Sequence, residues 1–502
     1  MGLPVALILL LFTQPTFADA PGDRHLPVIP RTAAEATLVA TILTPTVDFS
    51  TPEPSEAESA GAATVSSRPD AEAFSRVSAN MHISRQKDFK LGRALFNKLW
   101  IAAPAATTAS DGLGPLYNAR ACEACHKRDG RGHAPENPGT PALSMVLHLS
   151  VPGGTTPEAI EGWLATQGEP RYGSQLQDLA TPGQTAEGRM QIHYAEQAVT
   201  LADGMVVSLR APAYTIAAPG YGALPKGIML SPRVAPQMIG LGLLEAIPAA
   251  DILALADPGD ADGNGISGRA QIVPSQEFGV PMLGRFGLKA GVPTIREQAA
   301  LAFSTDMGLS TVLYSVSAGD CTAEQAACRS APNGAQYIDD GQEVSAKRLD
   351  LVAHYARNLG VPARRGAGAP QVLRGKQVFH ALNCTGCHTP KHMTHRLAGQ
   401  PEQSFQLIWP YTDLLLHDMG PGLADNRPEG RATGLEWRTA PLWGTGLTAS
   451  VSGHTQFLHD GRARSLLEAI LWHGGEAQAA RDGLVALPAA DRDALLAFLE
   501  SL

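Results

Sequence analysis

The sequence carries two copies of the motif Cys-x-x-Cys-His, and no other feature constrains the chain as strongly. The first copy is Cys122-Glu-Ala-Cys125-His126 and the second is Cys384-Thr-Gly-Cys387-His388. Two thiols at this spacing can add to both vinyl groups of one haem, and the adjacent His then faces the iron as its proximal ligand. A dithiol redox pair does not need the following His, and a four-thiolate zinc site would require the two motifs to meet. We therefore expect two covalently bound haem c groups, one in each half of the chain.

The remaining two cysteines, Cys321 and Cys328, have a different spacing and no following His. In an exported protein a local disulfide between them is the simplest interpretation. A thiol enzyme that exchanges disulfides is an alternative for the whole chain, and a haem stain on a denaturing gel would separate the two.

The first twenty residues have the features of a secretory signal. Residues 3–12 (LPVALILLLF) are apolar, and Ala18-Asp19-Ala20 has the small-x-small pattern of a cleavage site. The basic start of such a signal is missing, so a short anchor or a misplaced start codon stays an alternative. We expect residues 1–20 to be a signal peptide, the protein to be periplasmic or otherwise exported, and the mature chain to have no membrane span.

Residues 21–75 are rich in Pro, Ala, Ser, Thr and Glu and contain few large apolar side chains. Such a segment cannot build a core of its own, so we expect a disordered spacer. The formal net charge of −9 argues against a nucleic acid as partner.

Each Cys-x-x-Cys-His motif lies between two segments with helical periodicity. Gly92-Arg-Ala-Leu-Phe96 precedes the first motif and Gly375-Lys-Gln-Val-Phe379 precedes the second. Apolar residues recur on one helical face over 349–359 and again over 495–502, where the chain ends. An opening helix packed on a closing helix around a haem is the arrangement of a cytochrome c domain.

The length of 502 residues and the hydrophobic content of 44% allow two or three cores. We expect a mainly α protein with two cytochrome c-like domains. The first would occupy residues 76–360 and be enlarged by insertions, the second would occupy 371–502, and the boundary would lie at 361–370.

A second internal repeat lies outside the cysteine motifs. LRAPAY (209–214) and RTAPLW (438–443) align on Pro212 and Pro441, which are 229 residues apart. Arg233 and Arg462 follow at the same offset of 229 residues, and each precedes an apolar helical segment. A shared offset at two separate anchors indicates that the two halves are related.

The chain resembles the di-haem oxidoreductase family over about residues 74–502. Four stretches carry the resemblance: SDGLGPLYNARACEACHKRDGRG (110–132), SPRVAPQMIGLGLLEAIP (231–248), YTDLLLHDMGPGLAD (411–425), and WRTAPLWGTG with FLHDGRARSLLEAILWHGGEA (437–477). The family is akin to bacterial di-haem cytochrome c peroxidases and to the di-haem enzyme that matures methylamine dehydrogenase. The resemblance implies that one haem receives electrons and the other meets peroxide, and it identifies no substrate.

The resemblance also implies a sixth ligand for the C-terminal haem. In the related peroxidases this ligand, usually Met, comes from the helix after an H-D-G-type turn. In this chain the turn is His459-Asp460-Gly461 and the ligand position is His473. A bis-His iron is usually lower in potential than a His/Met iron. Met419 is the alternative ligand, in which case His473 would be an ordinary interfacial residue.

Four other histidines of the second half are not assigned to the iron. We expect His417 and His459 to lie beside the ligands or at the surface. We expect His392 and His395, just past the second motif, to be exposed to solvent.

The repeat makes a further prediction about the first haem. At the 229-residue offset His473 corresponds to Leu244, which cannot bind iron, and Glu245 is beside it. We therefore expect an open first haem, with Glu245 as a proton-transferring base whose pKa is raised by apolar neighbours. Arg233 or Arg210 would stabilise negative charge on the departing oxygen. The alternative is that Glu245 caps a helix or pairs with an Arg.

The loop from Asp260 to Arg269 places the oxygen ligands Asp260, Asp262 and Asn264 at alternate positions around a glycine turn. That is the opening of a calcium loop, but Gln271 stands where an EF-hand has its bidentate Glu. Bound Ca²⁺ and an ordinary Asx-rich turn are both open from the sequence.

The sequence as a whole predicts a periplasmic di-haem oxidoreductase that uses hydrogen peroxide or oxidises a protein substrate. Its electron donor would be a small cytochrome or a cupredoxin. The alternative is an electron carrier without catalytic activity, which requires His133, His148 or His193 to close the first haem.

Overall fold

The computed structural model describes residues 22–135, 140, 142–335 and 339–502. The fold is mixed, with 27% of the chain in helices and 18% in strands, so the prediction of a mainly α protein is wrong. Two separate cytochrome c-like domains are not seen in the described residues, because the largest hydrophobic clusters draw side chains from both halves. One cluster joins Leu209 of the first half to Trp472 and Phe498 of the second.

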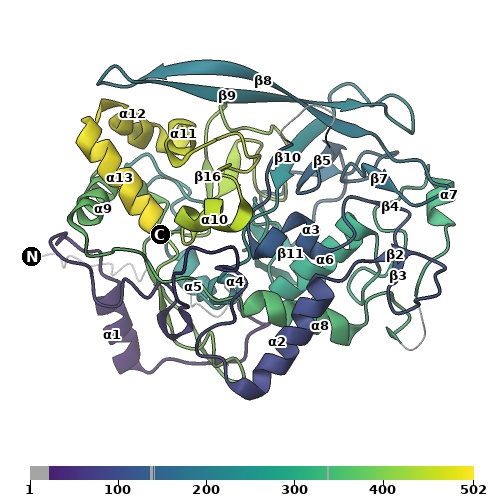
Figure 1. Cartoon of the computed structure of the whole chain (residues 1–502), viewed down its shortest axis with the longest axis horizontal. Coiled ribbons are helices and arrows are strands. Elements are labelled where there is room, and N and C mark those ends of the chain that lie inside the picture. Colours follow the sequence, from purple (N-terminus) through teal and green to yellow (C-terminus); the bar gives the residue numbers. More distant parts are fainter. Residues whose placement is uncertain (1–21, 136–139, 141, 336–338) are drawn as a thin grey trace, which may run out of the picture.

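Two pairs of helices frame the cysteine motifs. Helix α2 (Gln86–Phe96) packs on α8 (Ala346–Arg357), and α9 (Pro370–Ala381) packs on α13 (Ala489–Ser501), as Figure 1 shows. The repeated glycines explain the close approach. A Cβ on Gly92 would overlap the carbonyl oxygen of Leu351, and one on Gly375 would overlap that of Ala494. The Gly-x-x-x-Phe spacing therefore marks the two points where an opening helix crosses a closing helix.

The remaining helices are short, apart from α1, α6 and α12. They are α1 (Ala33–Leu43), α3 (Cys122–Cys125), α4 (Leu241–Glu245), α5 (Ala249–Leu253), α6 (Ile295–Met307), α7 (Ala326–Arg329), α10 (Thr448–Ser452), α11 (Leu466–Leu471) and α12 (Gln478–Ala486).

The long segment between the first motif and α4 forms strands rather than helices. Strand β5 (Met145–Pro152) pairs with β10 (Met229–Val234) and β6 (Thr166–Gln167), and β8 (Arg189–Thr200) pairs with β9 (Val206–Ala217). The other strands are two or three residues long: β1 (Val28–Ile29), β2 (Ile101–Ala102), β3 (Asp111–Leu113), β4 (Leu116–Tyr117), β7 (Leu179–Ala180), β11 (Ile272–Pro274), β12 (Pro281–Leu283), β13 (His392–Met393), β14 (Arg396–Leu397), β15 (Leu407–Ile408), β16 (Leu416–Asp418) and β17 (Glu436–Arg438).

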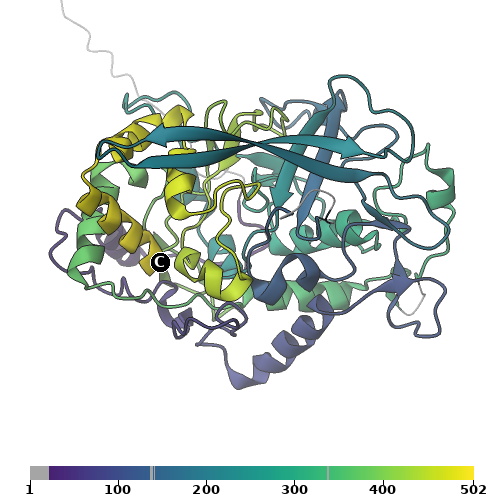
Figure 2. The ribbon, with the colours of Figure 1, turned by 45° about the horizontal axis from the view of Figure 1, so that its top comes forward.

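The β8–β9 ribbon reaches from the first half of the chain to the second. It runs along one side of the molecule to the C-terminal helices (Figure 2). At its tip the amide of Ala202 donates to the carbonyl of Val485, and Asp203 forms an ion pair with Arg492 at 2.8 Å. The ribbon thus covers part of the second half with residues of the first, which a division at residues 361–370 does not anticipate.

Residues 22–75 are ordered, so the expected disordered spacer is wrong for this segment. Helix α1 begins at the N-cap Thr32, whose side chain and that of Glu35 form a capping box. The segment lacks a core of its own but attaches through buried charges. Glu56 is 1% exposed and accepts from Lys376 at 2.7 Å and from Arg364. Composition alone misses this, because the partners lie more than 300 residues away.

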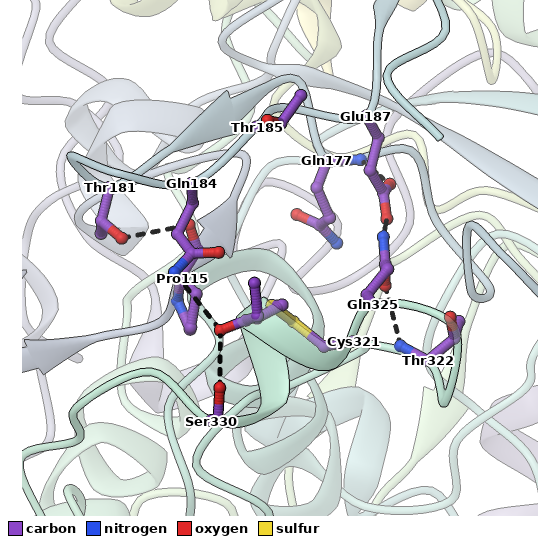
Figure 3. Close-up of a disulfide and its surroundings, with 12 residues drawn as sticks. Pro115, Gln177, Thr181, Gln184, Thr185, Glu187, Cys321, Thr322, Gln325 and Ser330 are labelled. Carbon is purple, nitrogen blue, oxygen red and sulfur yellow. Dashed lines mark hydrogen bonds between the residues drawn. A yellow bond between two sulfur atoms is a disulfide. The ribbon is translucent and has the colours of Figure 1, made fainter. Parts of the chain in front are cut away.

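The predicted disulfide between Cys321 and Cys328 is confirmed, with the two Cα atoms 6.1 Å apart. Figure 3 shows it beside Gln325, which donates to Glu187 at 2.6 Å and accepts from the amide of Thr322. No helix in the described part of the chain is both long and apolar enough to cross a bilayer.

Candidate functional site

The first Cys-x-x-Cys-His motif forms one helical turn, α3, followed by His126. Both Cys122 and Cys125 are free thiols. The His126 Nδ1 lies 2.7 Å from the carbonyl oxygen of Pro236 and the ring is 6.2 Å from that of Phe96 on α2. Its Nε2 has no hydrogen bond in the described part of the chain. Burial lowers the pKa of His126 to about 4, so the ring is neutral near pH 7, which is the form that binds a metal.

The second motif repeats this geometry. Cys384 and Cys387 are free, and the Nδ1 of His388 lies 2.9 Å from the carbonyl oxygen of Tyr411. The His388 ring is 6.3 Å from that of Phe379 on α9, and burial lowers its pKa to about 4. In both motifs a backbone carbonyl fixes Nδ1 as the N–H nitrogen and leaves Nε2 for another ligand.

His473 lies two residues after α11, and its ring is oriented in the same way as those of His126 and His388. Its Nδ1 is 2.7 Å from the carbonyl oxygen of Ala469, and Nε2 makes no hydrogen bond among the described residues. Burial lowers the pKa of His388 most, the bond to the Tyr411 carbonyl acts to raise it, and the charge of His473 acts to lower it. The rival ligand Met419 is half-buried and packs against the same hydrophobic cluster as Trp472.

The other histidines near the second motif are more buried than the sequence suggests. His392 is 4% exposed and its Nε2 lies 2.7 Å from the carbonyl oxygen of Thr412. The His395 side chain is 18% exposed and bonds to Asp23 at 2.8 Å. The prediction that both are exposed to solvent is therefore wrong. His459 is also buried and stacks on Trp437 with ring centroids 3.8 Å apart.

His417 has the most polar surroundings of these residues. Its Nε2 is 2.8 Å from Asp413 Oδ2, its Nδ1 is 2.7 Å from Glu476 Oε2, and the Cys387 Sγ lies 3.4 Å from Nδ1. The sequence predicts that His417 lies beside the haem ligands or at the surface. Of the two carboxylates that flank it, Asp413 lies four residues earlier in the same segment, whereas Glu476 comes from a segment 59 residues further along the chain.

The two predicted catalytic residues, Glu245 and Arg233, each form an ion pair with another residue. Glu245 is fully buried, accepts from Arg357 at 2.7 Å and from the amide of Ile295 at 2.9 Å. Burial acts to raise its pKa, but Arg357 and these hydrogen bonds prevail and lower it. The raised pKa expected for Glu245 is therefore wrong, and the alternative of an Arg pair is what the structure contains. Arg233 likewise donates to Glu429 at 2.7 Å.

Replacement of Glu245 by Gln should destabilise the protein. We expect the free energy of unfolding to fall by about 2–3 kcal/mol. This is less than the cost of breaking a fully buried ion pair, because the Arg357 side chain is 19% exposed. Because the folded-state pKa of Glu245 is lowered, its contribution is present above its unfolded pKa and disappears as the pH falls. Glu245→Gln should therefore be less sensitive to acid than the parent in denaturant unfolding. A parent-like stability at pH 7 would contradict this role.

The acidic loop contains one more carboxylate than the sequence pattern suggested. Ligand oxygens of Asp257, Asp260 and Asp262 lie within 4.8 Å of one another. Asn264 is used by the loop itself, since its amide donates to Asp262 Oδ2 at 2.8 Å and its Oδ1 accepts from the amide of Ile266. Gln271 is fully buried elsewhere and bonds to the carbonyl of Glu429. The sequence pattern did not include Asp257, because this residue precedes the alternating positions Asp260, Asp262 and Asn264.

The internal repeat appears as reciprocal contacts between the halves. Arg210 and Tyr214 of the first copy bond to the turn of the second, Arg210 to the carbonyl of Arg462 and Tyr214 to Asp460 at 2.7 Å. Trp443 of the second copy has its carbonyl bonded by Gln237 and its ring against Gly240 of the first. Each copy therefore makes contacts across to the other half of the chain.

A family model described as "Di-haem oxidoreductase, putative peroxidase" matches residues 55–145 and 158–502. The chain belongs to this family. The resemblance read from the sequence is thereby confirmed, and membership implies two haem groups. The residues present fit two haems, because each pair of free thiols is followed by a half-buried histidine. The Nε2 atom of that histidine makes no hydrogen bond among the described residues.

The comparison with curated proteins gives no match. Among solved structures the chain is similar to hydrazine synthase from Kuenenia stuttgartiensis, with 17% identity and a TM-score of 0.21. That likeness covers 37% of this chain and 64% of the other, so the chain spans less than two thirds of its length. A TM-score this low carries no argument about fold or chemistry.

Proposed function

We propose that this member of the family is an exported di-haem c oxidoreductase that uses hydrogen peroxide, or that oxidises a protein substrate. One observation supports it above all: each Cys-x-x-Cys-His motif presents two free thiols and an oriented neutral imidazole, and His473 presents a third imidazole, whose charge acts on His388 of the second motif. Haem bound at the two motifs would supply one-electron transfer and, at an open iron, a binding position for peroxide.

The chain's own residues have distinct tasks in this proposal. Cys122 and Cys125 would hold one haem, and Cys384 and Cys387 the other, through thioether bonds. His126 and His388 would be the proximal ligands, oriented by the carbonyls of Pro236 and Tyr411. His473 would close the second haem with its Nε2, which assigns electron entry to that haem and peroxide to the first.

The alternative, an electron carrier without catalysis, needs a histidine to close the first haem. His193 is exposed on β8, whereas His148 is half-buried on β5, where the charges of Arg233 and Glu429 act on it. Burial and then the charges of Arg233 and Arg427 keep the pKa of His148 well below its ordinary value, so it is a neutral ring available for coordination. A carbon monoxide titration, described in the Discussion, separates the two functions.

The proposal also includes export, an electron donor and a bound calcium ion. We propose export because residues 1–20, which lie outside the described residues, have the pattern of a secretory signal. The electron donor would be a small periplasmic cytochrome or a cupredoxin. A calcium ion would bind Asp257, Asp260 and Asp262, whose loop contacts the second motif where Ile266 lies against Gly386.

Haem content tests covalent attachment. Protein made with a haem-ligation system should gain the mass of two haems. Replacing Cys122 and Cys125 together by Ser should remove one haem, and replacing Cys384 and Cys387 together should remove the other. The Cys321/Cys328 pair replaced by Ser is the matched control and should retain both. A processed full-length chain without added haem mass, or with bound zinc instead, would overturn the proposal.

A further inference from the structure

His417 is buried between two carboxylates, one at each ring nitrogen. It lies on β16, its side chain is 2% exposed, and it contacts Asp413 through Nε2 and Glu476 through Nδ1. A neutral imidazole has a single N–H and can donate to only one of them. The other ring nitrogen would then direct its lone pair at a carboxylate oxygen in a buried site, which is unfavourable. With both carboxyl groups ionised, the geometry therefore requires a ring with protons on both nitrogens.

The two carboxylates are fixed by other bonds and cannot turn away. Asp413 Oδ1 accepts from the amide of Leu415 at 2.9 Å. Glu476 accepts from the hydroxyl of Ser267 at 2.6 Å and from the amide of Asp418 at 3.2 Å. Burial by itself lowers the pKa of His417, but the hydrogen bonds to Asp413, Cys387 and Glu476 more than offset it and raise the pKa to about 12.

This charged ring lies directly against the second haem motif. The Cys387 Sγ is 3.4 Å from Nδ1, and the amide of Asp413 donates to the carbonyl oxygen of Cys387 at 3.1 Å. Charge on His417 also adds to the effects that lower the pKa of His388. The ring is therefore coupled to both the thioether position and the proximal histidine.

We propose that His417 is a permanent imidazolium whose charge, 3.4 Å from the sulfur of Cys387, raises the reduction potential of the second haem. The inference rests on the proposed attachment of haem at Cys387. Iron(III) carries one more positive charge than iron(II), so a fixed cation nearby favours uptake of the electron. His417 is thus a positioning residue that opposes the low potential expected for bis-His ligation.

Spectroscopic redox titration of the two-haem protein and of His417→Gln tests the effect. At a fixed ambient potential the ratio of reduced to oxidised second haem should fall at least tenfold in the variant, a downward shift of about 59 mV for a one-electron couple. The first haem should titrate as in the parent. His417→Lys, which keeps the charge, should recover most of the shift.

His395→Gln is the matched control. His395 lies in the same half of the chain and also bonds to a carboxylate, but that carboxylate is Asp23, and among the described residues the His395 side chain has no hydrogen bond to the second motif. Both potentials should be unchanged in this variant. An equal fall in His395→Gln and His417→Gln, or an unshifted second haem in His417→Gln, would overturn the inference.

The protonation state can be measured directly in the parent protein. In reduced protein with ¹⁵N-labelled histidine, in which the second haem is low-spin, both ring nitrogens of His417 should be protonated from neutral pH up to about pH 9, where ordinary histidines are neutral. A singly protonated ring would overturn the inference even if His417→Gln fails to accumulate. Absence of haem mass at Cys387 would instead overturn the attachment on which the inference rests, so the two failures are distinguishable.

Discussion

His473→Gly should raise the carbon monoxide bound per reduced chain from one equivalent to two. In the parent the first iron would be open and the second closed by the Nε2 of His473, the nitrogen that its bond to Ala469 leaves free. Removal of the imidazole opens the second iron, which should also change from low-spin to high-spin. Optical titration with carbon monoxide and electron paramagnetic resonance measure both effects.

Met419→Leu provides the control for this experiment, because Met419 is the rival ligand. It should bind one equivalent and keep the low-spin signal. A low-spin signal that survives in His473→Gly but is lost in Met419→Leu would transfer the ligand to Met419. A parent that binds no carbon monoxide would have both irons closed and would favour the electron-carrier function.

Lys376→Met should lower the free energy of unfolding by about 3–5 kcal/mol, the usual cost of breaking a buried ion pair. Lys376 is 1% exposed on α9 and its ammonium lies 2.9 Å from Glu53 and 2.7 Å from Glu56. Its removal leaves Glu56 buried with Arg364 as its remaining cation. Denaturant unfolding of the two-haem protein gives the change.

Arg374→Met lies two residues away on the same helix and is the matched control. Its pair with Asp491 is solvent-exposed, with 49% of the Arg374 side chain accessible, so we expect a change of at most about 1 kcal/mol. Equal effects of the two substitutions would mean that residues 53–56 are not part of the folded core.

The candidate site was largely predictable because its signals are local. Cysteine spacing, the following His and the Gly-x-x-x-Phe pattern all lie within single turns or helices. The repeat indicated that the two halves are related, but it did not indicate which contacts its residues make. Arg210 and Tyr214 contact the second copy, because each copy packs across the interface between the halves.

The errors arose where long-range partners decide the outcome. The segment 21–75 has the composition of a spacer, yet Glu56 finds Arg364 and Lys376 across the fold. The mainly α expectation failed because residues between the first motif and α4 pair as strands β5–β10 and β8–β9, whose register depends on tertiary contacts.

By itself, the sequence determined the family, the two thiol pairs, His126 and His388, and the Cys321–Cys328 disulfide, because each depends on residue types at short fixed spacings. The tertiary structure alone decided the charge states. Glu245 is low in pKa because Arg357 lies against it, and His417 is charged because Asp413 and Glu476 face both of its nitrogens. Electrostatic energy depends on distance and burial in space, and residue spacing along the chain records neither.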